Sequence, residues 1–151
     1  MKKSELAVEI RYELDCLGRV AQAAEVLFRE KRSDKSPWPA AAAAKYISDV
    51  FMGLENLWKR KCRYRGESFP EGATSHRDVL AAFLEDPSLG RRLAPETAEH
   101  LAGYLRFRHR FIHGYGYEVT WEMVEKPLEL IPQTVAEMTR VWEQWLKETP
   151  E

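Results

Sequence analysis

The sequence has little cysteine, no long apolar run and almost no excess of charge of either sign. Two cysteines, Cys16 and Cys62, are too few for a disulfide framework. With 23 lysines and arginines against 24 acidic residues, the net charge of −1 excludes a uniformly basic nucleic-acid coat but not a local basic patch. No stretch reaches the roughly 18 apolar residues of a membrane helix, and the charged N-terminus lacks the apolar run of a signal peptide. We therefore predict a soluble, cytoplasmic protein that does not enter a membrane.

Glycine and proline number only eight each, and they cluster, which leaves long segments whose apolar residues recur at three- and four-residue steps. No segment alternates with the period of two that is typical of a strand, so we expect no sheet. The pattern predicts a single all-α domain over all 151 residues, a bundle of four main helices and one shorter helix. The main helices are expected at residues 4–31, 39–65, 95–113 and 120–148, and the shorter helix begins at Ser75.

Two of these predicted helices contain residues that end or interrupt a helix. Gly114 is placed to end the fourth helix in a left-handed conformation. Pro127 and Pro132 lie within the last segment, where they should kink the helix or delay its regular start.

The segment from Arg106 to His113 is the most unusual in the chain, because it holds three arginines, two histidines and no acidic residue in eight positions. Arg108 falls near the apolar face of its predicted helix, where an unpaired guanidinium is costly. It therefore either pairs with a carboxylate from another helix or faces a functional groove. Glu55, beside Leu54 on a mainly apolar face, is a candidate partner for an arginine.

The spacing within this segment limits what it can do. Arg108 and His113 lie about 140° apart around an ideal helix, so they converge only if the helix ends near His113 or a second subunit completes the site. His109 and His113 have a metal-pair spacing, but Arg110 stands where a zincin has glutamate, and no nearby carboxylate completes a ligand set. The neighbouring guanidinium groups would also repel a cation, so we predict no metal and no cofactor.

A second basic cluster lies at the end of the second predicted helix and has five cations in seven residues with no acid. It is either a solvated helix end, where cations suit the helix dipole, or a patch that binds RNA phosphates, with Tyr64 available for stacking. With Arg106, the cluster forms the candidate RNA-binding set: Lys59, Arg60, Lys61, Arg63 and Arg65.

The α-helical segment around His113 resembles a known family. The run Arg108-His-Arg-Phe-Ile-His113-Gly-Tyr115 matches the Arg-x4-His-x-Tyr signature of the HepT-like ribonuclease toxins of the HEPN superfamily. His109 matches the polar residue often found directly after the arginine. The helix order and the chain length are similar over nearly the whole sequence, so the resemblance implies a HEPN-like helical bundle.

The resemblance also implies a function. It implies a metal-independent endoribonuclease toxin of a toxin-antitoxin system, acting as a homodimer on RNA such as tRNA or mRNA, with Arg108 and His113 as catalytic residues. It implies a minimal nucleotidyltransferase antitoxin as partner, which inhibits the toxin by transferring AMP from ATP to Tyr115. Supporting roles fall to His109, Arg110 and Glu55. Some HEPN domains lack nuclease activity, so a non-catalytic module that binds nucleotide or a partner nucleotidyltransferase remains the alternative.

The residue chemistry agrees independently with cleavage of RNA without a metal. The reaction needs a base for the 2′-hydroxyl, an acid for the 5′-oxygen and a cation for the phosphate. Histidine titrates near neutral pH and suits the proton transfers, and arginine offers a planar fork to phosphate oxygens. One histidine and one arginine per chain are few for this task, and a dimer would supply two of each.

Overall fold

The computed structural model describes residues 1–30 and 36–151, and these residues contain helices and turns but no strand. The predicted all-α fold class is therefore confirmed. The helices are α1 (Lys3–Glu30), α2 (Trp38–Arg65), α3 (Ser75–Glu85), α4 (Pro95–His113), α5 (Trp121–Glu129) and α6 (Ile131–Glu148), with short 3-10 turns at Gly90–Arg92 and Gly116–Glu118. The predicted end of the first helix, at Lys31, lies outside the described residues.

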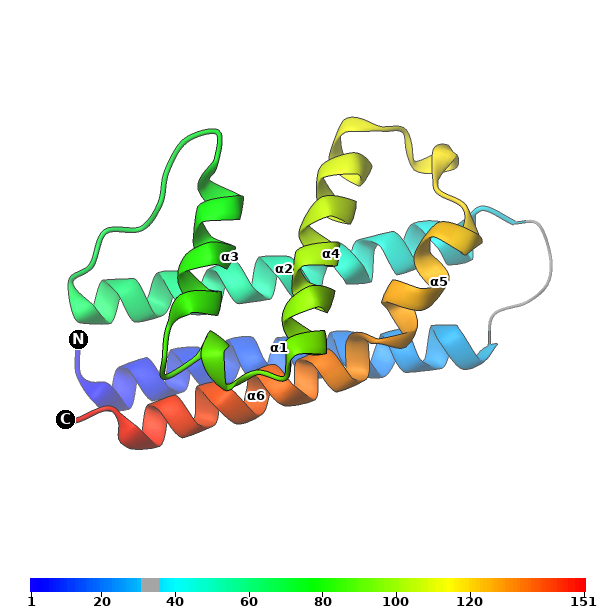
Figure 1. Cartoon of the computed structure of the whole chain (residues 1–151). Coiled ribbons are helices and arrows are strands. Elements are labelled where there is room, and N and C mark those ends of the chain that lie inside the picture. Colours follow the sequence, from blue (N-terminus) through cyan, green and yellow to red (C-terminus); the bar gives the residue numbers. More distant parts are fainter. Residues whose placement is uncertain (31–35) are drawn as a thin grey trace.

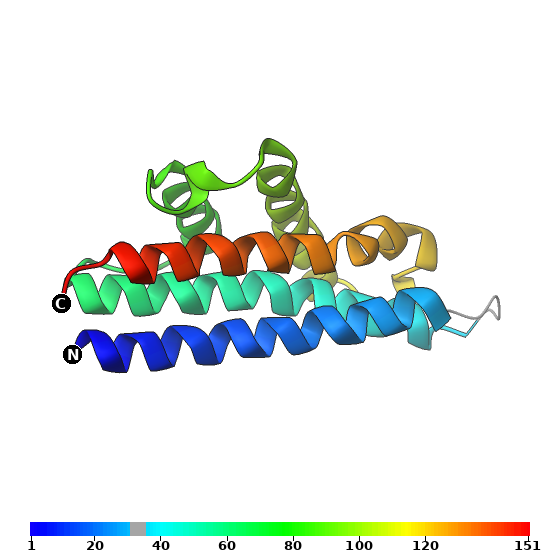
Figure 2. The same cartoon turned by 90° about the horizontal axis from the view of Figure 1, so that it is seen from below.

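Three long helices form the base of the molecule. α1, α2 and α6 lie side by side, and the two chain ends meet at the same end of this layer (Figures 1 and 2). Their apolar faces bury the core, as the three- and four-residue spacing predicts. Fully buried side chains in this layer include Leu6, Ile10, Ile47, Leu54, Val141 and Trp142. Among the described helices, none is long and apolar enough to cross a membrane.

α3 and α4 stand across this layer (Figure 1), and the buried residues of α4 lie in its N-terminal half. In its N-terminal half, Leu101 and Tyr104 are buried, and the Thr97 hydroxyl donates a hydrogen bond of 2.7 Å to Glu137 in α6. The Tyr104 hydroxyl donates to the Pro127 carbonyl at 2.9 Å, and burial raises the pKa of this hydroxyl to about 12. From Leu105 to His113 no residue is buried.

The last predicted helix, at residues 120–148, is two helices that meet at Leu130. Pro127 lies inside α5 and Pro132 in the first turn of α6. A proline lacks the N–H needed within a helix but suits a first turn, which explains the break. The kink that the prolines predict is confirmed, whereas one continuous helix is wrong. Gly66, with a φ of 69°, ends α2 directly after Arg65 as expected.

Candidate active site

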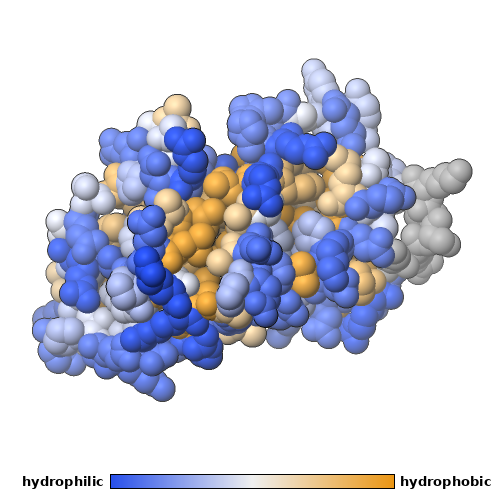
Figure 3. Space-filling model, in the orientation of Figure 1, coloured by the Kyte–Doolittle hydropathy of each residue, from blue (hydrophilic) through white to orange (hydrophobic). Residues whose placement is uncertain are grey.

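A pocket of about 850 Å³ lies between the start of α3 and the C-terminal half of α4. Figure 3 shows hydrophobic residues exposed between these two helices, with hydrophilic residues on both sides. Two walls line the pocket. The wall at the start of α3 consists of Gly72, Ala73, Thr74, His76 and Arg77, and the wall on α4 consists of Leu105, Arg106, Arg108, His109, Arg110, Ile112 and His113.

Arg108 and His113 both line this pocket, although α4 continues as a helix through His113. Arg108 is partly buried and His113 is exposed. Since the pocket spans a broad strip of α4, it accommodates both side chains within one protomer. Gly114 leaves the helix in an extended conformation, with φ −113° and ψ 174°, so the predicted left-handed cap is wrong. The backbone therefore continues in an extended conformation from Gly114 to Tyr115.

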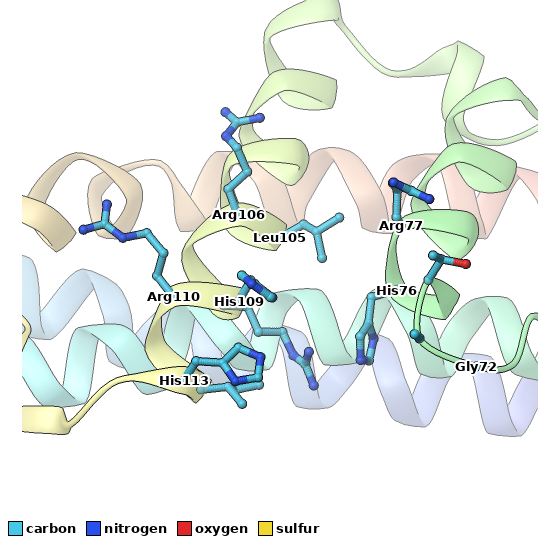
Figure 4. Close-up of a pocket in the computed structure, with 12 residues that line it drawn as sticks. Gly72, His76, Arg77, Leu105, Arg106, His109, Arg110 and His113 are labelled. Carbon is cyan, nitrogen blue, oxygen red and sulfur yellow. The ribbon is translucent and has the colours of Figure 1, made fainter.

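Histidines gather at the pocket. Three of the four histidines in the chain line it: His76, His109 and His113. The rings of His109 and His113 meet edge to face with centroids 4.6 Å apart. In Figure 4 these two rings project from α4 on one side, and His76 projects from α3 on the other.

The pocket is also strongly basic. Four arginines line it: Arg77 from α3, and Arg106, Arg108 and Arg110 from α4. Within residues 1–30 and 36–151 no carboxylate forms an ion pair with any of these four guanidinium groups. The described part of the structure therefore favours the functional groove over the structural ion pair for Arg108, and the concentrated positive charge attracts a polyanion.

Glu55 has a different partner from the one expected. Its Oε2 atom lies 2.5 Å from Nδ1 of His76, and the Glu55 side chain is only 14% exposed. The prediction that Glu55 pairs with an arginine is wrong, because His76 of α3 lies closer to it. Sequence reasoning assigned no role to His76, which is far in the chain from the basic segment of α4. Its position at the start of a helix, directly after Ser75, was the only available signal.

Tyr115 lies outside the pocket that holds Arg108 and His113. Its side chain is 71% exposed and stacks on Tyr117 with ring centroids 5.8 Å apart. It lines a separate hollow of about 170 Å³, and Arg110 lines both hollows. The Tyr115 backbone N–H donates to the Glu118 carboxylate at 3.4 Å, which holds the turn after α4. Arg110 is therefore the cation that links the tyrosine to the main pocket.

With this geometry in place, the chain can be compared with known proteins. A family model described as "HepT-like protein" matches residues 42–149, which is more than half of the chain. The chain belongs to the HepT-like family of the HEPN superfamily. No curated protein and no solved structure gives a significant match. In this HepT-like protein the matched range includes α3, α4 and the whole signature from Arg108 to Tyr115, whereas α1 precedes it.

The second basic cluster of the HepT-like protein is largely neutralised. Arg60 contacts Glu13 at 2.6 Å and Glu9 at 2.9 Å, and Arg63 also pairs with Glu9. Lys61 is buried and lies 2.9 Å from Glu67. These three cations are engaged by carboxylates within the fold, which leaves less of their charge available to RNA. The acidic partners were invisible to local sequence reasoning because they lie mostly on α1.

The other two cations of the cluster lie over aromatic rings. Lys59 Nζ is 5.7 Å from the centroid of Phe69, and the Arg65 guanidinium is 5.8 Å from the ring of Trp145. Both residues remain exposed. For a metal, the described residues offer no group of three or more histidine, cysteine, aspartate or glutamate side chains.

Proposed function

We propose that this HepT-like protein is a metal-independent endoribonuclease toxin of a toxin-antitoxin system, acting in the cytoplasm on RNA such as tRNA or mRNA. The observation that carries the proposal is the shared pocket, in which Arg108 and His113 lie together among arginines that have no acidic partner in the described part of the chain. The HepT-like family gives the toxin its context. The pocket volume of about 850 Å³ leaves room for more than one nucleotide.

The chemistry follows from the residue types. In RNA the 2′-hydroxyl is the nucleophile, so cleavage needs proton transfer and charge stabilisation but no metal-bound water. The His113 imidazole can take part in the proton transfers. The Arg108 guanidinium can form paired hydrogen bonds to the non-bridging phosphate oxygens and stabilise the charge that develops in the transition state. Arg106, Arg110 and Arg77 would hold the flanking phosphates.

A homodimer is part of the proposal. Ile112 beside the pocket is 53% exposed, and Leu105 also lines the pocket. Exposed apolar groups on a charged rim suit contact with a second copy of the chain. Such contact would bring two signature segments to one cleft.

Tyr115 is the proposed target of a nucleotidyltransferase antitoxin. Its phenol oxygen would attack the α-phosphorus of ATP, pyrophosphate would leave, and the phenol proton would pass to the transferase. The exposure of the ring supports this reaction. The added phosphate would lie next to Arg110, which lines both hollows, and would compete there with RNA phosphate.

The alternative is a non-catalytic module that binds nucleotide or the partner nucleotidyltransferase. Purified protein is incubated with tRNA and with total RNA in the presence of EDTA. We expect cleavage in the wild type, loss of cleavage in His113→Ala, and full cleavage in His100→Ala, since His100 lies outside the pocket and contacts Thr134. Intact RNA in all samples, with normal growth on expression, would favour the binding module.

A separate experiment tests the antitoxin. The protein is incubated with the nucleotidyltransferase, ATP and magnesium, and its peptides are analysed by mass spectrometry. We expect adenylate mass on the Tyr115 peptide of the wild type and of Tyr117→Phe, but not of Tyr115→Phe. If Tyr115→Phe cleaves RNA and is still silenced by turnover of the transferase, Tyr115 is not the switch.

A further inference from the structure

The pocket has a second titratable wall that the signature does not include. His76 lies on α3, opposite the signature residues of α4 (Figure 4). Its Nδ1 atom lies 2.5 Å from Glu55 Oε2, and Glu55 comes from α2. The imidazole of α3 and the Arg108 and His113 side chains of α4 therefore line one pocket, and α2 supplies the carboxylate that contacts the imidazole.

The contacts of His76 fix its ring. The edge of Phe51 packs against it with ring centroids 6.5 Å apart. The Glu55 side chain is 14% exposed, whereas the His76 side chain is 43% exposed. When Nδ1 donates its hydrogen to this largely buried carboxylate, Nε2 is the ring nitrogen that can accept a proton. The contact with Glu55 therefore suits a role of His76 as a proton acceptor.

The contact between His76 and Glu55 bears on the number of proton-transfer groups at the site. Cleavage of RNA needs both a base and an acid, and one chain has a single signature histidine, His113. The proposed homodimer would bring a second His113 to the cleft, whereas His76 offers a second proton-transfer group within the same protomer. We propose that His76, held by Glu55, is the general base of this site, with His113 as the acid. The inference rests on the proposed ribonuclease function and adds a catalytic residue to it.

His76 Nε2 takes the proton of the 2′-hydroxyl, and the 2′-oxygen forms a bond to phosphorus. The bond from phosphorus to the 5′-oxygen breaks, and that oxygen takes a proton from the His113 imidazolium. The products are a 2′,3′-cyclic phosphate and a 5′-hydroxyl. His76 ends protonated and His113 neutral, and exchange with water restores both. Glu55 is a positioning residue, because it acts only through His76.

The test separates the base from the acid. Single-turnover cleavage is measured on an RNA with an ordinary linkage and on one with sulfur in place of the scissile 5′-oxygen. A thiolate leaves without a proton, so the sulfur substrate compensates for a missing acid but not for a missing base. The variants are His76→Gln and His113→Ala, with His100→Ala as the matched control. Glutamine can still donate a hydrogen bond to Glu55, which preserves the fold, but it cannot accept the proton.

We expect His76→Gln to lower the cleavage rate by at least about a hundredfold on both substrates. His113→Ala should lose a similar factor on the ordinary RNA and recover at least about tenfold on the sulfur substrate. Glu55→Gln should lower the rate about tenfold and displace the rising limb of the pH–rate profile, because it alters His76. The other charged groups at the pocket, Arg77 and the α4 segment from Arg106 to His113, are the same in these samples except at the mutated position. His100→Ala should stay within about twofold of the wild type, since it leaves the acid and base in place.

Circular dichroism melting of each variant accompanies the kinetics. If folded His76→Gln cleaves like the wild type while His113→Ala does not, the inference is wrong and the proposed function stands. Rescue of His76→Gln by the sulfur substrate would also overturn the base assignment. If the wild type cleaves neither substrate, the proposed function fails and the inference fails with it. If His76→Gln is unfolded, His76→Asn is tested by the same criteria.

Discussion

Two segments of this chain have nearly the same composition and opposite environments. The basic cluster Lys59–Arg65 and the segment Arg106–Arg110 are both dense in cations and contain no acid. In the first, two arginines and a lysine are engaged by carboxylates, and Arg60 and Arg63 share the acids of α1. In the second, the arginines line an open pocket without an acidic partner among residues 1–30 and 36–151. The cations of α2 stabilise the fold, and those of α4 remain available.

The difference shows that helix register across a packed pair decides what a basic segment does. Glu9 and Glu13 are four residues apart, so they share one face of α1 and reach Arg60 together. Burial lowers the pKa of Arg60, but the hydrogen bonds to Glu13 and Glu9 outweigh it and raise the pKa above its ordinary value. Among residues 1–30 and 36–151, no carboxylate forms an ion pair with the arginines at the exposed end of α4. Variants in the two segments should therefore change different measurements.

The largest effect is expected from Arg108→Ala. Cleavage of RNA should fall by at least about a hundredfold, because a guanidinium that stabilises the transition state is lost. The free energy of unfolding should change by less than about 0.5 kcal/mol, because no ion pair of the described residues is broken. Single-turnover kinetics and urea titration measure the two quantities. A strong loss of stability would instead support a structural role for Arg108.

Arg60→Ala should show the reverse pattern. Removing Arg60, whose side chain is 24% exposed, leaves the Glu13 carboxylate, 9% exposed, without a cationic partner and with only a 3.4 Å hydrogen bond from Asn56. We expect unfolding to become easier by about 1–3 kcal/mol, with the cleavage rate of the folded protein within about twofold of the wild type. Arg19→Ala is the matched control, because its pair with Asp15 is largely exposed and contributes little. A stable Arg60→Ala protein with weak RNA binding would contradict the comparison.

A smaller effect is expected on the salt dependence of RNA binding. In a His113→Ala background, which prevents cleavage, Arg106→Ala and Arg110→Ala should each reduce the slope of log Kd against log salt by about 0.7, the loss of one phosphate contact on single-stranded RNA. Arg63→Ala should leave the slope unchanged, since Arg63 is paired with Glu9. Fluorescence anisotropy at several salt concentrations gives these slopes. Equal slopes in all three variants would mean that the two segments bind RNA alike.

The smallest effect is expected for Lys59→Ala and Arg65→Ala. Each removes an exposed cation from an aromatic face, of Phe69 and Trp145 respectively. Such contacts contribute about 0.5–1 kcal/mol at exposed sites. Thermal melting should record this modest loss, and RNA affinity should stay within about twofold. A larger loss of affinity would return both residues to the RNA-binding set.

Much of the fold followed from the sequence, because helix periodicity and breakers are local signals. The sequence predicted that the shorter helix begins at Ser75 and that the second helix ends near Arg65, and α3 and α2 do so. The sequence did not predict that one helix ends and another begins at Leu130, because the apolar spacing of residues 120–148 continues on both sides of it. The spacing of apolar residues shows which side of a helix is buried. Because this spacing continues from α5 into α6, it does not show that the helix is interrupted between them.

The candidate site was predictable only where its residues are close in the sequence. Arg108, His113 and Tyr115 form one motif, and the pocket of α4 contains the first two as expected. The pairing of Glu55 with His76 joins residues that are 21 positions apart. The partners of Arg60 lie 47 and 51 positions away. Such pairs depend on how helices cross, and no pattern within a single helix records that.

The uneven burial of α4 along its length has a consequence for heating. Thr97, Leu101 and Tyr104 tie the first half of the helix to the core, whereas the half that carries the signature has no buried residue. Local opening of a segment requires less free energy where fewer contacts must be broken. The amide protons of the signature half should therefore exchange with water sooner than those before Tyr104. On warming, the protein should lose activity at a temperature at which its three-helix layer is still intact.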